Sequence, residues 1–529
     1  MAAAAATVHA KDVSGEYSPA VRLVILIAIM LSTILEVLDT SIVNVAIPDM
    51  QGNLGATVDQ INWVSTGYIL ANVIILPLTG WLSNYFGRRL YLAGSILLFT
   101  AASLLCGTST TLNMLVFFRI LQGAGGAALL STAQATLIEV FPRKQLPMVQ
   151  ALFSMGLVAA PTFGPTVGGF ITDSYNWRWI FFINIPIGIL AGFLVLTFLQ
   201  DSKYQTKRVP IDFIGIGMLA IGLGSLQTML EKGNRESWFE SPLISGLAVS
   251  ATVFLIAFVF WELKTEYPAV KLSVLKHKSF AAGSVYGMVL GFGLYGGVFI
   301  LPIFLQEIQH FTAFQTGRLL LPGGLVTALS LPILGRIMGK VDPRLIVGFG
   351  SILFAISMFQ LQTMNIDTGQ NDLIIPLLIR GLALSCMFLP LVLTSLAGLP
   401  PQEVGYASGI FNLSRQVGGS IGIAFLTTQL DHRTAIHTVN LANHVSFSDS
   451  ITQQRILMAQ QQLVAKGVPP IQAFYSAIGT INASIARQAI TMSFEDGFRI
   501  IGLSFLLALP LLVLLKRPKG PPSGPVDAH

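Results

Sequence analysis

The stretch LVILIAIMLSTILEVLDTSIVNVAI, residues Leu23–Ile47, is apolar over a length that can cross the roughly 30 Å hydrocarbon core of a bilayer as one helix. It carries two carboxylates near its middle, Glu36 and Asp39, three residues apart and therefore on one face of that helix. An ionisable side chain inside a membrane is costly, so it persists where it faces a polar cavity, finds a partner or carries protons. The stretch therefore predicts a membrane helix with a role in transport.

The composition extends this prediction to the whole chain. Of its 529 residues, 53% are hydrophobic and only 11% are charged, with a mean hydropathy of +0.70, whereas soluble domains are roughly 25% charged. Dividing the chain into apolar stretches of about 20 residues gives about fourteen. We therefore expect an all-α polytopic membrane protein. The predicted spans begin near Val21, Ile61, Leu90, Leu112, Pro147, Ile180, Asp212, Leu243, Phe280, Arg318, Arg344, Leu373, Gly405 and Phe498.

The basic residues of the loops predict the orientation. The connections with a surplus of Lys and Arg all fall on one side, which the positive-inside rule makes cytoplasmic. With an even number of spans, we expect both termini in the cytoplasm. The net charge of +6 then reflects topology, and no nucleic-acid partner is expected. The basic connections contain Arg88 and Arg89, Arg143 and Lys144, Lys203 with Lys207 and Arg208, Lys264 to Lys278, Lys340 with Arg344, and Lys516 to Lys519.

Other classes of segment and site are not indicated. The N-terminus, Met1 to Ala20, leads into a full-length span without a small-residue cleavage site, so no removable signal peptide is expected. Cys106 and Cys386 both lie in apolar spans, so we expect no disulfide framework, metal site or cofactor.

An internal repeat predicts two related halves. The run Gly80–Arg89 resembles Gly335–Arg344 at an offset of 255 residues, and Arg119 and Arg380 match at an offset of 261, each two spans further on. Two six-helix bundles with two inserted helices would account for about fourteen spans. The predicted parts are a cytoplasmic segment 1–20, a first bundle 21–200, an inserted pair with its linkers 201–279, a second bundle 280–516 and a cytoplasmic tail 517–529.

Most of the hydrophilic sequence outside the predicted spans lies in residues 429–496, on the extracytoplasmic side. Ser448 or Ser450 is suited to cap a helix that Gly467–Pro470 closes, and a second helix is predicted from Ile471 to about Met492. We expect a helical hairpin, either as a solvated cap or as a docking surface for another protein. A loop of this length inside a compact protein is more often functional than idle.

Two further motifs lie inside the first predicted bundle. Arg119 and Gln122 share a helix face beside the glycine groove Gly123–Gly126, and Asp39 and Arg119 both fall in the outer half of the membrane. A pair between them is allowed, either as a static ion pair or as part of a transport site. The run Gly156–Gly169 places small residues at fourfold spacing together with two prolines, which favours close helix packing.

The chain resembles the fourteen-helix drug:proton antiporter branch of the major facilitator superfamily, and within it EmrB-type multidrug efflux pumps. The resemblance covers essentially the whole chain. It rests on Leu38–Pro48, on the loop motif with Gly80, Gly87, Arg88 and Arg89, on Arg119–Gly126 with Gly123, on the run with Pro161, Gly164, Pro165 and Gly168, on Trp177–Pro186 and on Phe411–Ser420.

The resemblance implies roles and partners. It implies that Asp39 belongs to a proton-coupling region, that Arg119 assists proton transfer, and that Gly164 and Pro165 belong to an antiporter signature. Glu36 is the second carboxylate of this region, and the sequence leaves open which of the two titrates. A location in the bacterial inner membrane is implied, with a periplasmic membrane-fusion adaptor and an outer-membrane channel as partners. The loop motif usually has an acidic residue at Asn84, so we expect gating through Arg88 and Arg89 to rely on neutral hydrogen bonds or helix ends.

The leading hypothesis is proton-driven export of amphipathic toxic compounds through a largely apolar cavity. A dedicated transporter for one metabolite or a siderophore-like compound is the alternative on the same scaffold. No zinc-protease, nucleophile-elbow or Walker motif is present, so neither an enzyme nor an ATP-driven pump is expected. A non-transporting scaffold would not need the buried charges. The candidate substrate-binding residues are Tyr68, Gln122, Tyr295, Phe299, Gln306 and Phe411.

Overall fold

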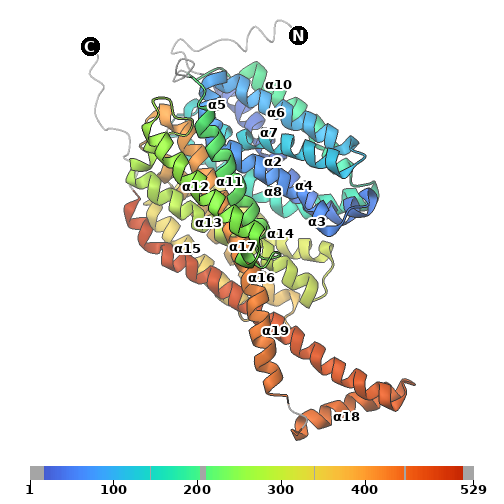
Figure 1. Cartoon of the computed structure of the whole chain (residues 1–529). Helices are drawn as coiled ribbons and strands as arrows, with labels where there is room; N and C mark the ends of the chain where they lie inside the picture. The colour runs from blue at the N-terminus through green and yellow to red at the C-terminus, as the bar shows by residue number, and fades with distance from the viewer. Residues whose placement is uncertain (1–16, 143, 203–209, 339, 446–447, 516–529) are drawn as a thin grey trace, which may run out of the picture.

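The computed structural model describes residues 17–142, 144–202, 210–338, 340–445 and 448–515, and every regular element in these ranges is a helix. The predicted tail 517–529 and most of the predicted segment 1–20 lie outside them, as do Arg143, Lys203, Lys207 and Arg208. The described chain begins and ends at one end of the molecule, here called the terminal end, and α18 lies at the opposite, hairpin end (Figure 1).

The helices follow the predicted spans along the chain (Figure 1). The first group contains α2 (Pro19–Leu54), α3 (Val58–Ile61), α4 (Trp63–Ile75), η1 (Leu76–Leu78), α5 (Thr79–Phe86), α6 (Arg88–Thr108), α7 (Leu112–Val140), α8 (Leu146–Ser174), α9 (Trp179–Phe182) and α10 (Asn184–Phe198). The inserted segment contains α11 (Phe213–Lys232), η2 (Trp238–Glu240), α12 (Pro242–Lys264) and η3 (Leu272–Lys276). The second group contains α13 (Lys278–Ile303), η4 (Phe304–Ile308), α14 (Ala313–Ile337), α15 (Pro343–Leu361), α16 (Gln370–Leu396), η5 (Pro401–Glu403), α17 (Val404–Asn443), α18 (Ser450–Ala465), α19 (Pro470–Ala508) and η6 (Leu509–Leu514).

Twelve helices in the described ranges have the length and apolar composition needed to cross a membrane. The prediction of about fourteen spans is therefore approximate. The other two predicted spans, near Pro147 and Gly405, coincide with α8 and α17, which are 29 and 40 residues long but are not among the twelve. The all-α membrane fold itself is confirmed.

The two copies of the repeated loop motif lie at equivalent helix crossings. A Cβ atom on Gly80 of α5 would lie 2.6 Å from the backbone nitrogen of Tyr406, at the start of α17. A Cβ atom on Gly335 of α14 would lie 3.0 Å from the Cβ of Ala151 in α8. Each glycine thus lets a helix of one group approach a helix of the other group closely. These crossings join the two groups toward the terminal end.

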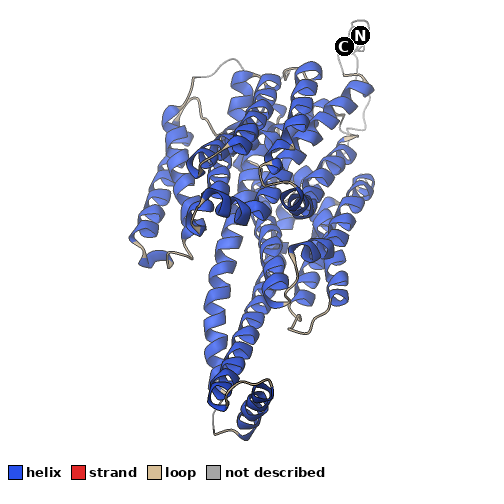
Figure 2. Cartoon of the chain, turned by 90° about the vertical axis from the view of Figure 1, so that its right-hand side faces the viewer, coloured by secondary structure: helices blue, strands red, loops and turns tan. Residues whose placement is uncertain are grey.

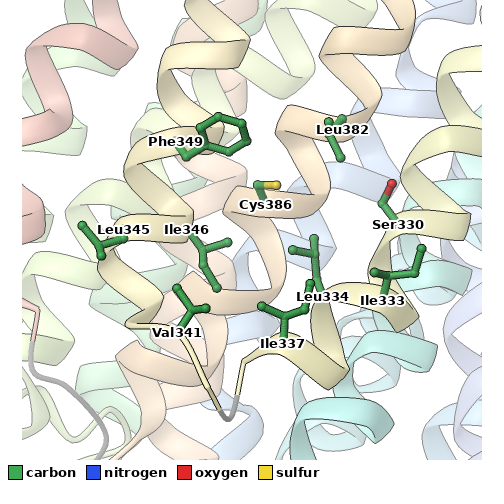
Figure 3. Close-up of a pocket in the computed structure, with 10 residues that line it drawn as sticks. All are labelled: Ser330, Ile333, Leu334, Ile337, Val341, Leu345, Ile346, Phe349, Leu382 and Cys386. Atoms are coloured by element: carbon green, nitrogen blue, oxygen red, sulfur yellow. The ribbon is translucent and has the colours of Figure 1, made fainter.

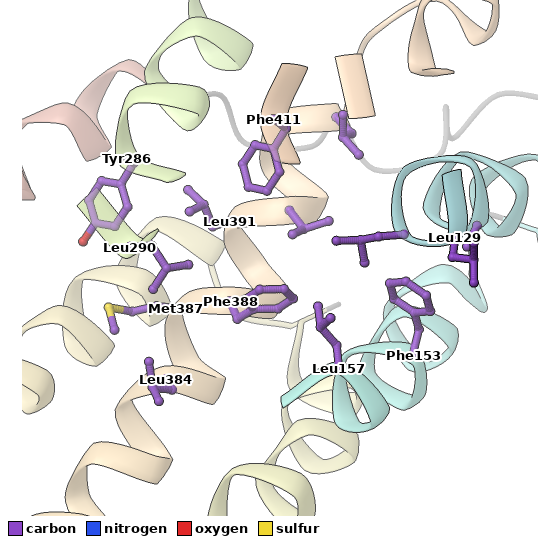
Figure 4. Packing of buried hydrophobic residues seen from close by; sticks show 14 of the residues in the cluster. Leu129, Phe153, Leu157, Tyr286, Leu290, Leu384, Met387, Phe388, Leu391 and Phe411 are labelled. Carbon is purple, nitrogen blue, oxygen red and sulfur yellow. The ribbon is translucent and has the colours of Figure 1, made fainter. Parts of the chain in front are cut away.

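Apolar and polar contacts hold the two groups together. One hydrophobic cluster includes Leu129 and Phe153 of the first group and Phe388 and Phe411 of the second (Figure 4). Inside the same interface, Gln134 accepts two hydrogen bonds through its Oε1 atom. The donors are Ser408 Oγ, at 2.9 Å, and Asn412 Nδ2, at 3.2 Å.

The inserted helices contact both groups. Toward the hairpin end, Glu231 of α11 contacts Thr66 of the first group, and the indole of Trp238 donates to Thr428 of α17 at 2.8 Å. Asn234 donates to Asp431, also on α17, at 2.7 Å. The inserted helices therefore pack against both groups near the hairpin end and are not a detached pair.

The segment 429–496 is a hairpin built differently from the prediction. α17 continues unbroken to Asn443, and α19 runs without a break from Pro470 into the last span, so two long helices project from the body and α18 joins them (Figure 2). Asp496 accepts a hydrogen bond from His437 at 3.0 Å, at the base of the hairpin.

The predicted cap of α18 was wrong. Asp449, not Ser448 or Ser450, is the N-cap, because its carboxylate accepts the backbone N–H of Thr452 at 3.0 Å. These hydrogen bonds to the ionised form lower the pKa of Asp449 from its usual value.

Candidate functional site

A fully enclosed polar network surrounds Asp39 in α2. Asp39 is 1% exposed, and its Oδ2 atom lies 2.6 Å from Nη1 of Arg119 in α7. Its Oδ1 atom accepts two further hydrogen bonds, from Gln122 Nε2 at 3.0 Å and from Asn184 Nδ2 at 2.9 Å. The carboxylate is thus held by one cation and one amide from α7 and by a second amide from α10.

Arg119 is held as firmly as its partner. It is 1% exposed, its Nε donates to the carbonyl of Val64 at 3.1 Å, and its Nη1 also donates to Gln122 at 2.7 Å. Its guanidinium lies 4.2 Å from the centre of the Tyr68 ring, in cation–π geometry.

The glycine groove beside Arg119 explains how α4 comes this close. A Cβ atom on Gly123 would lie 2.2 Å from the carbonyl oxygen of Tyr68, and one on Gly126 would lie 2.6 Å from the Tyr68 hydroxyl. Only glycine therefore allows Tyr68 to cover the ion pair from the α4 side.

The sequence analysis assigned no site role to three polar residues of this region, although Asn184 belongs to the Trp177–Pro186 motif. Asn184 begins α10 and connects Asp39 to Ser103, whose hydroxyl it reaches at 3.0 Å. Asn72 of α4 donates to Glu36 Oε1 at 3.3 Å. The available signal was a lone asparagine or serine inside an apolar span, which is weak because such residues also serve helix packing.

Glu36 lies one helical turn from Asp39, nearer the terminal end, and is only half paired. Its Oε1 accepts from Asn72, whereas its buried Oε2 has no hydrogen-bond partner in the described part of the chain. Glu36 also interacts electrostatically with Arg415 of α17. The two carboxylates therefore differ: Asp39 is sealed within the first group, and Glu36 faces the second.

The loop motif forms a charged cluster at the terminal end. Arg88 pairs with Glu139 at the end of α7, so the expectation of neutral contacts for this arginine was wrong. Arg89 donates to the carbonyl of Leu196 in the last turn of α10, as expected for a helix-end contact. Asn84 reaches across to the other group and donates to the Tyr406 hydroxyl at 3.3 Å.

Gly87 of the same loop has a required conformation. Its φ of +84° is readily available only to glycine, and a Cβ atom there would lie 2.7 Å from Oδ1 of Asp201. The same oxygen accepts the backbone N–H of Arg89 at 3.0 Å. The motif glycine therefore makes room for a carboxylate that holds the start of α6.

The glycine and proline run lies against α2 just beyond Asp39. A Cβ atom on Gly164 would lie 2.3 Å from the Cβ of Ser41, and one on Gly168 would lie 3.1 Å from the side chain of Ile42. Pro161 and Pro165 lie within α8, which continues through both, and their side chains are outside the described structure. The signature run therefore packs on the carboxylate-bearing helix.

The six candidate substrate-binding residues do not form one cluster. Tyr68 and Gln122 are buried in the Asp39 network, while Phe411 is fully buried against Gly287 in the second group. Tyr295 is 39% exposed. Phe299 is partly buried and Gln306 is exposed within η4, a single π-helical turn. Their role in substrate binding stays a prediction.

The two groups differ in charge at equivalent places. Arg380 in α16 matches Arg119, but α13 has no carboxylate at the place of Asp39, and Arg380 forms no ion pair with any described residue. Its Nη1 instead faces Gly297, 3.9 Å from a Cβ placed there. Arg415 stacks on Phe388 at 5.3 Å. Within the described ranges, the buried carboxylates Glu36 and Asp39 thus lie in the first group, and Arg380 and Arg415 of the second group form no ion pair closer than 4 Å.

Comparisons with known proteins agree with this architecture. The family model described as Major Facilitator Superfamily matches residues 29–423. Multidrug export protein EmrB of Escherichia coli K12 is 37% identical over 507 residues, 95% of this chain and 97% of that protein. The EmrB protein of Haemophilus influenzae is 39% identical over 430 residues, 81% and 84% of the two chains.

A solved structure shows the same fold. The proton:xylose symporter XylE bound to 6-bromo-6-deoxy-D-glucose superposes with a TM-score of 0.61, covering 93% of this chain and 95% of that chain. At 14% sequence identity, this likeness concerns the fold alone.

Proposed function

The chain belongs to the major facilitator superfamily, and from that premise we propose that it exports amphipathic drugs or other toxic compounds in exchange for protons. The family and the EmrB relatives make it a multi-pass membrane transporter of the drug-efflux kind. The proton coupling, the residues that carry it and the partners are our proposal.

The observation that supports proton coupling most strongly is the enclosed Asp39–Arg119 pair beside the half-paired Glu36. A buried ion pair contributes little to stability, because desolvation of the two charges offsets their attraction. The second carboxylate one turn away, Glu36, interacts with Arg415 of the second group, which favours a working site over a static one.

In the proposed cycle, a proton reaches Asp39 and neutralises it. The neutral carboxyl then holds Arg119 less strongly, and α7 and α2 become free to shift relative to each other. Glu36, which faces the second group, takes either a proton or the cationic end of a substrate. Each proton that enters down a potential of 100 mV supplies about 2.3 kcal/mol to drive the export step.

The chemistry of the interface suits amphipathic substrates of either charge. Glu36 offers a carboxylate for a cation, whereas Arg380 and Arg415 offer guanidiniums for an anion. The surrounding side chains are mainly apolar and aromatic, as in small-molecule sites generally. A dedicated transporter for one metabolite remains the alternative, and a panel of substrates separates the two.

We further propose that the terminal end is cytoplasmic in the bacterial inner membrane and that the hairpin projects into the periplasm. The described terminal-end connections carry Arg88, Arg89, Lys264, Lys276 and Lys278, which supports this orientation. The length of α17 and α19 beyond the body supports a role for α18 in docking a periplasmic adaptor, which would connect the pump to an outer-membrane channel.

Proton release on substrate binding tests the proposed competition. Purified protein in weakly buffered detergent solution is mixed with ethidium at pH 7, and the released protons are measured with a pH dye. We expect release from the wild type and a several-fold smaller release from Glu36→Gln. Binding of ethidium without proton release at any pH between 6 and 8 would contradict the proposal, and binding of one metabolite alone would favour the alternative.

A further inference from the structure

A membrane-facing groove lies in the second group, away from the carboxylate site. It has a volume of about 400 Å³, and side chains from α14, α15 and α16 point into it (Figure 3). This volume is within the range of small-molecule pockets. The lining residues are Ser330, Ile333, Leu334, Ile337, Val341, Leu345, Ile346, Phe349, Leu382 and Cys386.

The groove has a buried floor and an apolar rim. Leu334, Ile346 and Cys386 at the floor are all less than 10% exposed. Ile333 and Leu345 on the rim are 58% and 69% exposed, on helices that are long and apolar enough to cross a membrane. The groove therefore opens toward lipid, and the occupant it fits is an acyl chain.

The position of the groove along the membrane is defined by its helices. Ser330 to Ile337 form the last two turns of α14, and Leu345 and Ile346 belong to the first turn of α15. Both helices reach the terminal end there. With that end cytoplasmic, the groove lies in the inner leaflet of the membrane. The part of the groove nearest the terminal end then lies at the level of the lipid headgroups.

Three cations lie near the terminal end of the helices that line the groove: Arg336 in the last turn of α14, Lys340 in the following loop and Arg344 in the first turn of α15. Arg336, Lys340 and Arg344 each directly neighbour a lining residue in the chain. None of the three forms an ion pair within the described ranges, and the buried Nε of Arg344 has no hydrogen-bond partner there. The nearby carboxylate of Asp342 is engaged with the backbone N–H of Arg344 as the N-cap of α15. Basic pockets between membrane helices on the cytoplasmic side bind anionic headgroups.

We propose that this groove is a binding site for an anionic phospholipid of the cytoplasmic leaflet. One acyl chain lies in the groove against Cys386 at its floor, and the phosphate contacts Arg336, Lys340 and Arg344. The site explains two observations together: an apolar groove with a buried floor, and unpaired cations at the one end where a headgroup would lie. It rests on the proposed orientation but not on the proposed proton coupling.

The site has a defined relation to the interface between the two groups. α14 carries Gly335 toward Ala151 of α8, whereas Ile333 and Ile337 of the same turns line the groove. A bound lipid therefore packs on the helix that forms this contact between the groups.

Native mass spectrometry of the purified full-length protein tests the proposal. Dioleoyl phosphatidylglycerol is titrated against dioleoyl phosphatidylcholine and oleate, with the wild type, Ile337→Trp and the double variant Arg336→Gln/Lys340→Gln. We expect phosphatidylglycerol to bind at least tenfold more tightly than phosphatidylcholine, and each variant to weaken it about tenfold. The matched controls are Leu329→Trp, which is 68% exposed on α14 outside the groove, and Lys264→Gln/Lys278→Gln.

A second measurement uses the two cysteines of the chain. Cys386 lies at the groove floor, and Cys106 is buried in the first group, so alkylation by a small maleimide reports on the groove with an internal reference. We expect phosphatidylglycerol to slow the alkylation of Cys386 several-fold and to leave Cys106 unchanged. Equal affinity for the two phospholipids, or unchanged alkylation of Cys386 with lipid bound, would overturn the proposal. Tighter binding of oleate would replace the phospholipid with a free fatty acid.

Discussion

At the scale of single residues, Asp39 and Glu36 have different surroundings although the sequence places them on one helix face. Asp39 is enclosed by Arg119, Gln122 and Asn184, and Glu36 has one oxygen without a partner in the described structure. We therefore expect substitution of the two carboxylates to have different consequences. Loss of Asp39 leaves a buried cation unpaired, whereas loss of Glu36 leaves the fold nearly intact.

The first prediction concerns the stability of the purified protein. Asp39→Ala should reduce the free energy of unfolding by about 3–5 kcal/mol, because the guanidinium of Arg119 loses its counter-ion. Glu36→Gln should reduce it by less than about 1 kcal/mol, since the amide can keep the bond to Asn72. Thermal unfolding in detergent measures both. Equal destabilisation by the two substitutions would contradict the described difference.

The second prediction concerns Gly123. Gly123→Ala should shift Tyr68 away from Arg119, because the new Cβ would lie 2.2 Å from the Tyr68 carbonyl oxygen. Overpacking of this kind costs about 1–3 kcal/mol. Gly94→Ala on α6 is the control, since nothing lies within 4 Å of a Cβ there. Ethidium transport and thermal stability should fall for Gly123→Ala only. Equal behaviour of the two variants would contradict the proposal that Gly123 allows Tyr68 to cover the ion pair.

The sequence identified the Asp39–Arg119 pair and placed Gln122 on the Arg119 helix face, but it assigned no role to Asn184 or Asn72. Two opposite charges in one half of a membrane have few alternatives, so their pairing was predictable. Asn184 and Asn72 could have faced lipid headgroups, other helices or solvent, and only the packed structure places them. The partner of Arg88 was also beyond the sequence, because Glu139 lies far along the chain at the end of α7.

At the scale of elements, the hairpin shows how helix boundaries differ from predicted ones. The predicted cap serines flank Asp449, which has the stronger hydrogen-bond acceptor and takes the cap position. The break expected near Met492 is absent, because α19 has no proline or glycine pair there that would end a helix. Which residue caps α18 and where α19 ends both depend on local geometry that the sequence does not show. The existence of α18 and α19, in contrast, followed from sequence signals.

The third prediction tests this cap. Asp449→Ala should increase hydrogen exchange in the first turn of α18, because the Thr452 N–H loses its acceptor. Ser450→Ala is the matched control at the next position. The pKa of Asp449 is lowered in the folded protein, so the stabilisation is present above its ordinary value near 3.9 and is lost as the pH falls through the lowered one. In the wild type, the protection of the first turn of α18 from hydrogen exchange, corrected for the intrinsic exchange rate, should therefore stay constant between pH 5 and 8.

At the scale of the whole molecule, the internal repeat predicted the two groups and the structure shows how the copies diverge. Gly80 and Gly335 serve equivalent crossings, while Arg119 has a carboxylate partner and Arg380 has none in the described chain. The hydrophobic pattern made the all-α membrane fold predictable. The packing of the inserted helices against both groups was not, because it depends on contacts such as Trp238 with Thr428.

The fourth prediction separates transport from assembly. Replacing residues 444–483 by a flexible glycine-serine linker removes α18 but keeps the contacts of His437 with Asp496 and of Arg487 with the carbonyl of Ile308. We expect transport in proteoliposomes to stay within about twofold of the wild type and drug resistance in cells to be lost. Unchanged resistance in cells would show that the hairpin is not an adaptor-docking surface.

The central claim is that substrate export is coupled to protons through Asp39, and transport in proteoliposomes tests it most directly. Ethidium accumulation and the fluorescence of a trapped pH dye are recorded together under an imposed pH gradient, for the wild type, Asp39→Asn and the control Asp59→Asn, whose carboxylate is exposed near the hairpin end. We expect gradient-driven ethidium movement with proton counterflow in the wild type and the control, and neither in Asp39→Asn. Ethidium movement that is indifferent to the gradient, or coupling that survives in Asp39→Asn, would contradict the account.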